Sequence, residues 1–80
     1  MLIKENVYLA LYEIALEYEN AVGIYGKFNS PHEAYSIILE EVDELWHEIK
    51  KRKKNRTKMR NEAKQIAAMA LRFMVELADD

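Results

Sequence analysis

Apolar residues recur at helical spacing along almost the whole chain, and only one proline and two glycines interrupt them in 80 residues. No segment carries the sustained alternation of apolar and polar residues that is typical of a half-buried strand. These patterns predict an all-α fold. The length is that of one small domain, residues 1–80, which buries only about 60–65% of the surface that its unfolded chain exposes.

Three helices are expected, over residues 3–21, 31–50 and 56–78. Gly23 is placed to end the first helix, and Asn55 can cap the third. The second helix opens at Ser30-Pro31-His32-Glu33, where a capping serine, a proline in the first turn and a glutamate three residues after the cap form a capping box. The expected core stripes are Ile3, Val7, Leu11, Ile14, Tyr18 and Val22 in the first helix, and Ala34, Ile38, Val42, Leu45 and Ile49 in the second, with Tyr35, Leu39 and Trp46 widening the second stripe.

The third helix is apolar over well more than half of its circumference, so it needs cover on several sides. The chain has no cysteine to form disulfide bonds and no Cys/His spacing typical of structural zinc. Oligomerisation is then the remaining way to stabilise so small a domain. We expect a dimer or tetramer, in which antiparallel three-helix subunits form an oligomeric bundle and the third helix packs against its mate.

Charge is strongly segregated along the chain. Residues 1–49 carry a net charge of −8, residues 50–60 carry +8, and residues 61–80 carry −2. A local basic patch on an acidic chain fits a triphosphate-sized partner better than nucleic acid, because nucleic-acid-binding domains are generally basic overall. The N-terminus lacks the features of a signal peptide, and no apolar run approaches the roughly 20 residues that a bilayer requires. We expect a cytoplasmic protein with no membrane partner.

Two carboxylates flank the apolar stripe of the second helix, and a third interrupts the apolar face of the next. At about 100° per residue, Glu41 and Glu44 lie on one flank of the core stripe, one turn apart. Glu62 lies inside the apolar arc of the third helix, with Gln65 just outside it. An unpaired carboxylate in such a position is costly, so Glu62 needs a partner.

An antiparallel hairpin with its turn near Lys53 brings these side chains together. Glu44 then faces Glu62, and Glu41 faces Gln65, because each pair is equidistant from the turn. Four oxygen-bearing side chains at one depth suit Mg²⁺, with Mn²⁺ as the alternative, since both prefer carboxylate ligands and keep waters that a phosphate can displace. These four residues are the predicted metal ligands.

Two structural explanations compete with a metal site. The acidic residues between 40 and 48 can form a solvated face with pairs such as Glu48 with Arg52, which is the favoured interpretation of an isolated acidic helix. Glu62 can instead pair with a base such as Arg72 of a neighbouring subunit. The place of Glu62 within an apolar arc shifts the balance toward the metal site.

The chain from about residue 28 to residue 77 resembles the all-α nucleoside triphosphate pyrophosphohydrolases, the MazG-like superfamily. The hallmark of that family is an E-E-x-x-E helix followed by an E-x-x-D helix. Glu40, Glu41 and Glu44 match the first motif, and Glu62 matches the first position of the second, where Gln65 stands in place of the aspartate. Residues 32–35 and 65–70 are also similar to a small subgroup of the family.

The resemblance implies a bundle of dimerised or tetramerised subunits in which Glu41, Glu44 and Glu62 bind Mg²⁺ and act in catalysis. The implied reaction is the attack of water on the α-phosphorus of a nucleoside triphosphate, which releases a nucleoside monophosphate and pyrophosphate. Gln65 can still offer its amide oxygen, but one negative charge is lost. That loss favours the alternative, a catalytically degenerate member that binds nucleotide or metal, or a helical assembly module.

The candidates for contact with the nucleotide are Glu40 and three bases of the turn between the second and third helices, Lys54, Arg56 and Lys58. For the bases, a solvated turn that complements the helix dipole is the simpler role. A nucleic-acid-binding hairpin built on residues 50–60 ranks last among the functions, because it leaves the buried glutamate of the third helix unexplained.

A second E-x-x-D occurs at Glu76 and Asp79. It lies about 21 Å along the helix from Glu62, at 1.5 Å per residue, and would face the start of the second helix instead of its acidic stretch. We expect it to be an ordinary polar C-terminus.

Overall fold

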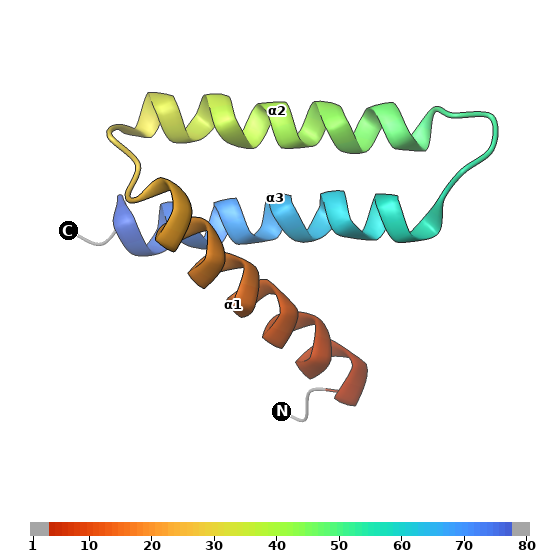
Figure 1. Cartoon of the computed structure of the whole chain (residues 1–80), viewed down its shortest axis with the longest axis horizontal. Coiled ribbons are helices and arrows are strands. Elements are labelled where there is room, and N and C mark those ends of the chain that lie inside the picture. Colours follow the sequence, from red (N-terminus) through yellow and green to blue (C-terminus); the bar gives the residue numbers. More distant parts are fainter. Residues whose placement is uncertain (1–3, 78–80) are drawn as a thin grey trace.

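Three α-helices follow one another in the computed structural model, which describes residues 4–77 (Figure 1). α1 spans Glu5–Tyr25, α2 spans Pro31–Ile49 and α3 spans Arg56–Glu76. α2 and α3 form an antiparallel hairpin, and α1 crosses α3 obliquely near the C-terminal end of α3. No strand occurs between residues 4 and 77, so the prediction of an all-α fold with three helices is confirmed.

The starts of α2 and α3 are capped as their sequences predict. Ser30 Oγ accepts a hydrogen bond from the backbone N–H of Glu33 at 3.1 Å, and Asn55 Oδ1 accepts one from the N–H of Lys58 at 3.1 Å. The return bond of the capping box is displaced by one residue. The Glu33 carboxylate accepts from the backbone N–H and the side-chain amide of Asn29, at 3.2 and 2.8 Å. Each cap satisfies N–H groups that a helix start otherwise leaves without partners.

α1 is longer than its sequence predicts. The helix continues through Gly23 to Tyr25, so the prediction that Gly23 ends it is wrong. Gly26 ends the helix instead, with φ 71° and ψ −163°, and its N–H donates to the carbonyl of Val22 at 3.0 Å. A side chain rarely adopts that backbone conformation, whereas a glycine inside a helix costs only about 1 kcal/mol.

α3 is the central helix of the fold. It packs against α2 along the hairpin and against α1 on another side, whereas α1 and α2 do not pack against each other over the described residues. Part of the wide apolar surface of α3 is therefore covered by α1 and α2 of the same chain. The expected packing of α3 against a mate is not needed to cover these two sides.

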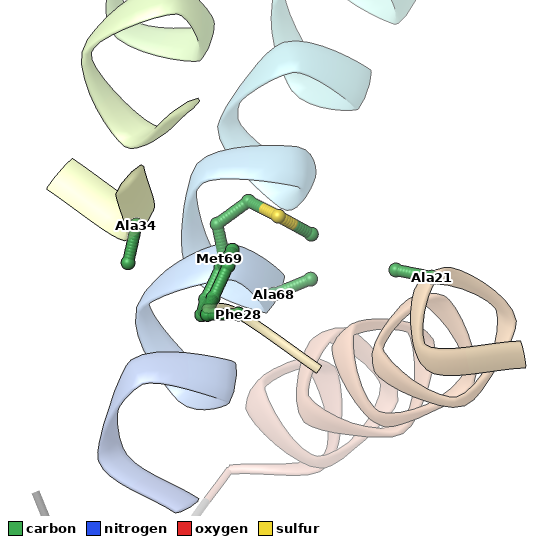
Figure 2. Close-up of a cluster of buried hydrophobic side chains, with 5 residues drawn as sticks. All are labelled: Ala21, Phe28, Ala34, Ala68 and Met69. Carbon is green, nitrogen blue, oxygen red and sulfur yellow. The ribbon is translucent and has the colours of Figure 1, made fainter. Parts of the chain in front are cut away.

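The core is small and lies where the three helices meet (Figure 2). Five hydrophobic residues between residues 4 and 77 are buried, and three of them are alanines. No large side chain is fully buried among the described residues. The buried residues are Ala21, Phe28, Ala34, Ala68 and Met69, with Ile14, Ile37, Ile38, Phe73 and Leu77 packed against them.

Several residues of the expected core stripes are exposed instead. Val7 and Leu11 of α1 and Val42 of α2 keep more than two fifths of their surface in solvent, and Ile3 lies outside the described residues. Tyr35, Leu39 and Trp46, which were expected to widen the core of α2, are exposed as well. Helical spacing identifies an apolar face, but it does not say whether a neighbouring helix covers that face.

No helix between residues 4 and 77 has the length and apolar character needed to cross a bilayer.

Candidate metal centre

Three glutamates converge where α2 faces α3. Glu41 and Glu44 project from successive turns of α2, and Glu62 projects from α3. One carboxylate oxygen of each lies within 4.8 Å of the other two. The hairpin register therefore brings these three side chains together, as expected, because Glu44 and Glu62 lie at equal distances from the turn and Glu41 lies one helical turn before Glu44. Gln65, the fourth predicted ligand, lines the same cavity one turn further along α3.

The cluster is held in an environment that disfavours negative charge. Burial, together with the neighbouring carboxylates of Glu44 and Glu62, raises the pKa of Glu41 from its ordinary value of 4.5 to about 7. Burial also raises the pKa of Glu62, with the Glu44 carboxylate as the next cause. No basic side chain of residues 4–77 forms an ion pair with any of the three. Repulsion among the carboxylates is thus left uncompensated by the chain.

One oxygen of the cluster has no partner. Glu62 Oε2 is shielded from solvent and accepts no hydrogen bond from the described part of the chain. Buried carboxylate oxygens without a donor are rare because each loses its hydration without compensation. An added cation or donor at this position would remove the penalty, so the orphaned oxygen indicates a missing partner.

Glu48 differs from the three clustered glutamates because it has its own cation. Its Oε2 accepts a hydrogen bond from Lys51 Nζ at 2.7 Å, and this bond lowers the pKa of Glu48. The expected pair of Glu48 with Arg52 is replaced by this i, i+3 pair, because the α-helix stops at Ile49 and the chain turns. The charge of Glu48 still raises the pKa of Glu62, and Glu48 Oε1 is buried without a partner in the described part of the chain, as Glu62 Oε2 is.

The cluster lines part of a cavity of about 550 Å³, a volume within the usual range of ligand pockets. All three helices contribute to its wall. The polar lining residues are Glu17 and Asn20 of α1, Glu41 and Glu44 of α2, and Glu62, Gln65 and Arg72 of α3, while Ala21, Ile24, Phe28, Ile37 and Met69 supply the apolar lining. The cavity therefore joins an acidic region to an apolar one.

Arg72 is engaged within its own chain. Its Nε donates to Glu76 Oε2 at 3.0 Å, its Nη2 donates to the carbonyl of Gly26, and its guanidinium lies 4.0 Å from the ring centre of Phe28. Both side chains of the Arg72–Glu76 pair are almost fully buried. Arg72, the alternative partner considered for Glu62 of a neighbouring subunit, is therefore already paired within its own chain.

Glu76 is not part of an ordinary polar C-terminus, contrary to expectation. Its Oε1 accepts the backbone N–H of Phe28 at 2.8 Å, so the carboxylate ties α3 to the α1–α2 loop. Burial alone would raise its pKa, but the hydrogen bond from Phe28 and the Arg72 guanidinium together lower it. Asp79, the other residue of this second E-x-x-D, lies outside the described residues.

The residues predicted to contact the nucleotide are not brought into the cavity. Glu40 projects from α2 into solvent, and Lys54, Arg56 and Lys58 are exposed around the α2–α3 turn. Their role in nucleotide contact stays a prediction. The exposed positions agree with the simpler role of a solvated turn for the three bases.

Glu17 and Asn20 are cavity residues that the sequence did not identify. They lie one turn apart on α1, on a flank that helical spacing describes as polar and solvated. Only the crossing of α1 over α3 turns this flank toward the cavity. The sequence feature that comes nearest to predicting them is their i, i+3 spacing beside Ala21 and Ile24. Many solvated helices show the same spacing, so it does not identify a cavity.

Comparison with known proteins adds no family assignment, since the chain matches no family model, no curated protein and no solved structure.

Proposed function

We propose that this protein is a metal-dependent nucleotide pyrophosphohydrolase, which converts a nucleoside triphosphate into a nucleoside monophosphate and pyrophosphate. The observation that carries the proposal is the convergence of Glu41, Glu44 and Glu62 on a large cavity, with one buried oxygen of Glu62 left without a partner. The match of residues 40–44 to E-E-x-x-E supports the same class of reaction.

The donor set fits a divalent cation. Three carboxylates with no compensating base are mutually repulsive, and a cation between them would reverse the sign of that interaction. The set contains only oxygen donors and opens onto a cavity, which favours Mg²⁺, or Mn²⁺ as the alternative, over zinc. Glu41, Glu44 and Glu62 would hold the ion, and the amide oxygen of Gln65 is available beside them.

A divalent cation at this cluster would neutralise charge on the phosphates and favour attack by water on the α-phosphorus. The rest of the cavity wall would bind the remainder of the nucleotide. Phe28, Ile37 and Met69 provide an apolar surface for a base.

The functional unit that we propose is a homo-oligomer, a dimer or a tetramer, working in the cytoplasm. The small core and the many exposed large hydrophobic side chains support association.

A second candidate is a protein that binds metal or nucleotide without hydrolysing it. Gln65 favours this candidate, because it supplies an amide where the resemblance calls for a fourth carboxylate, so a bound cation would be less fully neutralised. The two candidates share the cluster and differ only in turnover.

Thermal unfolding with and without Mg²⁺ or Mn²⁺ tests the cation site first. A ligand that binds only the folded chain stabilises it by about 2.7 kcal/mol at a hundredfold excess over its dissociation constant. We expect the unfolding midpoint to rise in wild type and in the control Glu19→Gln, an exposed glutamate of α1, and to stay unchanged in Glu62→Gln. An equal rise in all three proteins would exclude the cluster as the cation site.

Pyrophosphate release from the common nucleoside triphosphates then separates the two candidates. Turnover that depends on the divalent cation and is lost in Glu62→Gln supports the hydrolase. Stabilisation by cation and nucleotide with no pyrophosphate released would establish the binding protein instead.

A further inference from the structure

α2 carries a stripe of large apolar side chains that residues 4–77 leave partly exposed. Tyr35, Leu39, Val42 and Trp46 are 63%, 44%, 41% and 57% exposed. Their spacings of four, three and four residues follow the 3.5-residue repeat by which two helices pack along a shared seam. We name these four residues the α2 stripe.

The α2 stripe lies away from the acidic cluster. At 100° per residue, the middle of the stripe is roughly 170° around α2 from Glu44. Glu41 and Ile37 lie on the Glu44 side of the helix and line the cavity, whereas no residue of the stripe does. A partner on the stripe would therefore leave the mouth of the cavity free.

The chain by itself is less compact than its length permits. A folded monomer of 9.4 kDa has an accessible surface of about 5,000 Å². The observed surface is 6495 Å². The radius of gyration is 13.8 Å, against about 12 Å for a compact domain of this length. The excess surface is of the size that one partner contributes to a stable interface, about 800 Å² or more.

The α2 stripe is self-complementary when two copies run antiparallel. A two-fold axis between residues 40 and 41 places Tyr35 of one copy opposite Trp46 of the other, and Leu39 opposite Val42. Each aromatic residue then meets an aromatic residue and each aliphatic residue meets an aliphatic one. In a two-fold interface residue i of one copy contacts residue j of the other and residue j contacts residue i, so the like-with-like pairing of the stripe favours a second copy as its partner.

We propose that two copies of this chain associate through the α2 stripe, with their α2 helices antiparallel about a two-fold axis. The proposal specifies the surface of the proposed homo-oligomer and assigns it to α2 instead of α3. It does not depend on hydrolysis or on cation binding, because the cluster and the stripe lie on opposite flanks of α2.

Sedimentation of single variants provides the first test. Leu39→Glu places a charge in the middle of the stripe and should weaken self-association at least tenfold. Leu16→Glu on α1 is the matched control, since Leu16 is 47% exposed, and it should sediment as wild type does. Far-UV circular dichroism confirms that each variant remains helical. A monomeric wild type at high concentration, or an equal effect of the two variants, would overturn the proposal.

Cysteine cross-linking provides a second test that needs no disruptive charge. The chain has no cysteine, so Tyr35→Cys and Trp46→Cys each introduce a single thiol. With oxidised glutathione as oxidant, a mixture of the two variants should form a disulfide between unlike chains. Trp46→Cys alone should not, because two antiparallel copies hold its thiols about 16 Å apart along the helices.

Each outcome of the cross-linking bears on the proposal. Mixed disulfides without cross-linking of Trp46→Cys alone support the antiparallel seam. Efficient cross-linking of Trp46→Cys alone would indicate parallel helices, and no cross-linking in a protein that still sediments as a dimer would place the interface elsewhere. The last result would refute the α2 stripe as the interface while leaving the proposed homo-oligomer intact. The response of the unfolding midpoint to Mg²⁺ should be the same in all these cases.

Discussion

Replacing Glu41 by glutamine should stabilise the protein in the absence of a divalent cation. The carboxylate of Glu41 is close to two other carboxylates and has no basic partner among the described residues. Glutamine has nearly the same shape and no charge, so it removes the repulsion without leaving a cavity. The effect depends on pH, because the wild-type residue can avoid the repulsion by taking up a proton.

The magnitude follows from the pKa of Glu41, which rises from 4.5 in a free chain to about 7 in the fold. Between these two pH values the folded chain keeps a proton that the unfolded chain has released, so the stability of wild type falls as the pH rises through this window. At about 1.4 kcal/mol per pKa unit, the shift sets an upper limit of about 3.5 kcal/mol. Since the carboxyl is partly exposed and screened by solvent, we expect about 1 kcal/mol at pH 8.

The assay is thermal or urea unfolding followed by circular dichroism, at several pH values and with a chelator present. For a domain of this length, 1 kcal/mol corresponds to a rise in the midpoint of about 4–8 °C. Glu41→Gln should unfold above wild type at pH 8, and the two should converge near pH 4.5. Glu19→Gln, the exposed control, should show neither effect.

Excess Mg²⁺ should reverse the order of the two proteins, because the cation stabilises wild type and loses a ligand in the variant. A Glu41→Gln protein that is less stable than wild type at pH 8 without cation would refute the reasoning. That result would mean that the carboxylate makes a favourable contact in the fold and that the cluster is a structural network.

Two glycine substitutions test the assigned end of α1, and two glutamate substitutions test the buried ion pair. Gly23→Ala should stabilise the protein by about 0.5–1 kcal/mol, because Gly23 is inside α1 and nothing lies within 4 Å of an added Cβ. Gly26→Ala should destabilise it by about 1–3 kcal/mol through its positive φ alone, since its surroundings are equally open. Urea unfolding of both variants measures the difference, and equal effects would contradict the assigned helix end. Glu76→Gln should cost on the order of 3 kcal/mol by leaving the buried Arg72 without a counterion. Glu13→Gln, at the exposed pair with Arg60, should leave the stability almost unchanged, and similar losses of stability in Glu76→Gln and Glu13→Gln would contradict the stabilising role of the buried pair.

The helix starts and the hairpin depend on interactions between residues that are close together in the sequence, so they can be predicted from the sequence alone. Capping by Ser30 and Asn55 depends on residues three positions apart, and a single turn sets the register of the hairpin. The convergence of Glu41, Glu44 and Glu62 needs only these local features, since two antiparallel helices place residues at equal distances from their turn side by side. The candidate site could therefore be located before any coordinates were known.

The sequence by itself determined the helices, the hairpin and the acidic cluster, because each depends on periodicity and on neighbours a few residues away. Only the tertiary structure decided where α1 lies, and with it the place of Glu17 and Asn20 in the cavity wall, the burial of Arg72 with Glu76, and the exposure of Trp46. Helical spacing states which face of a helix is apolar, but it carries no information on which neighbour covers that face. That choice depends on how whole helices pack, and contacts between residues far apart in the chain settle it.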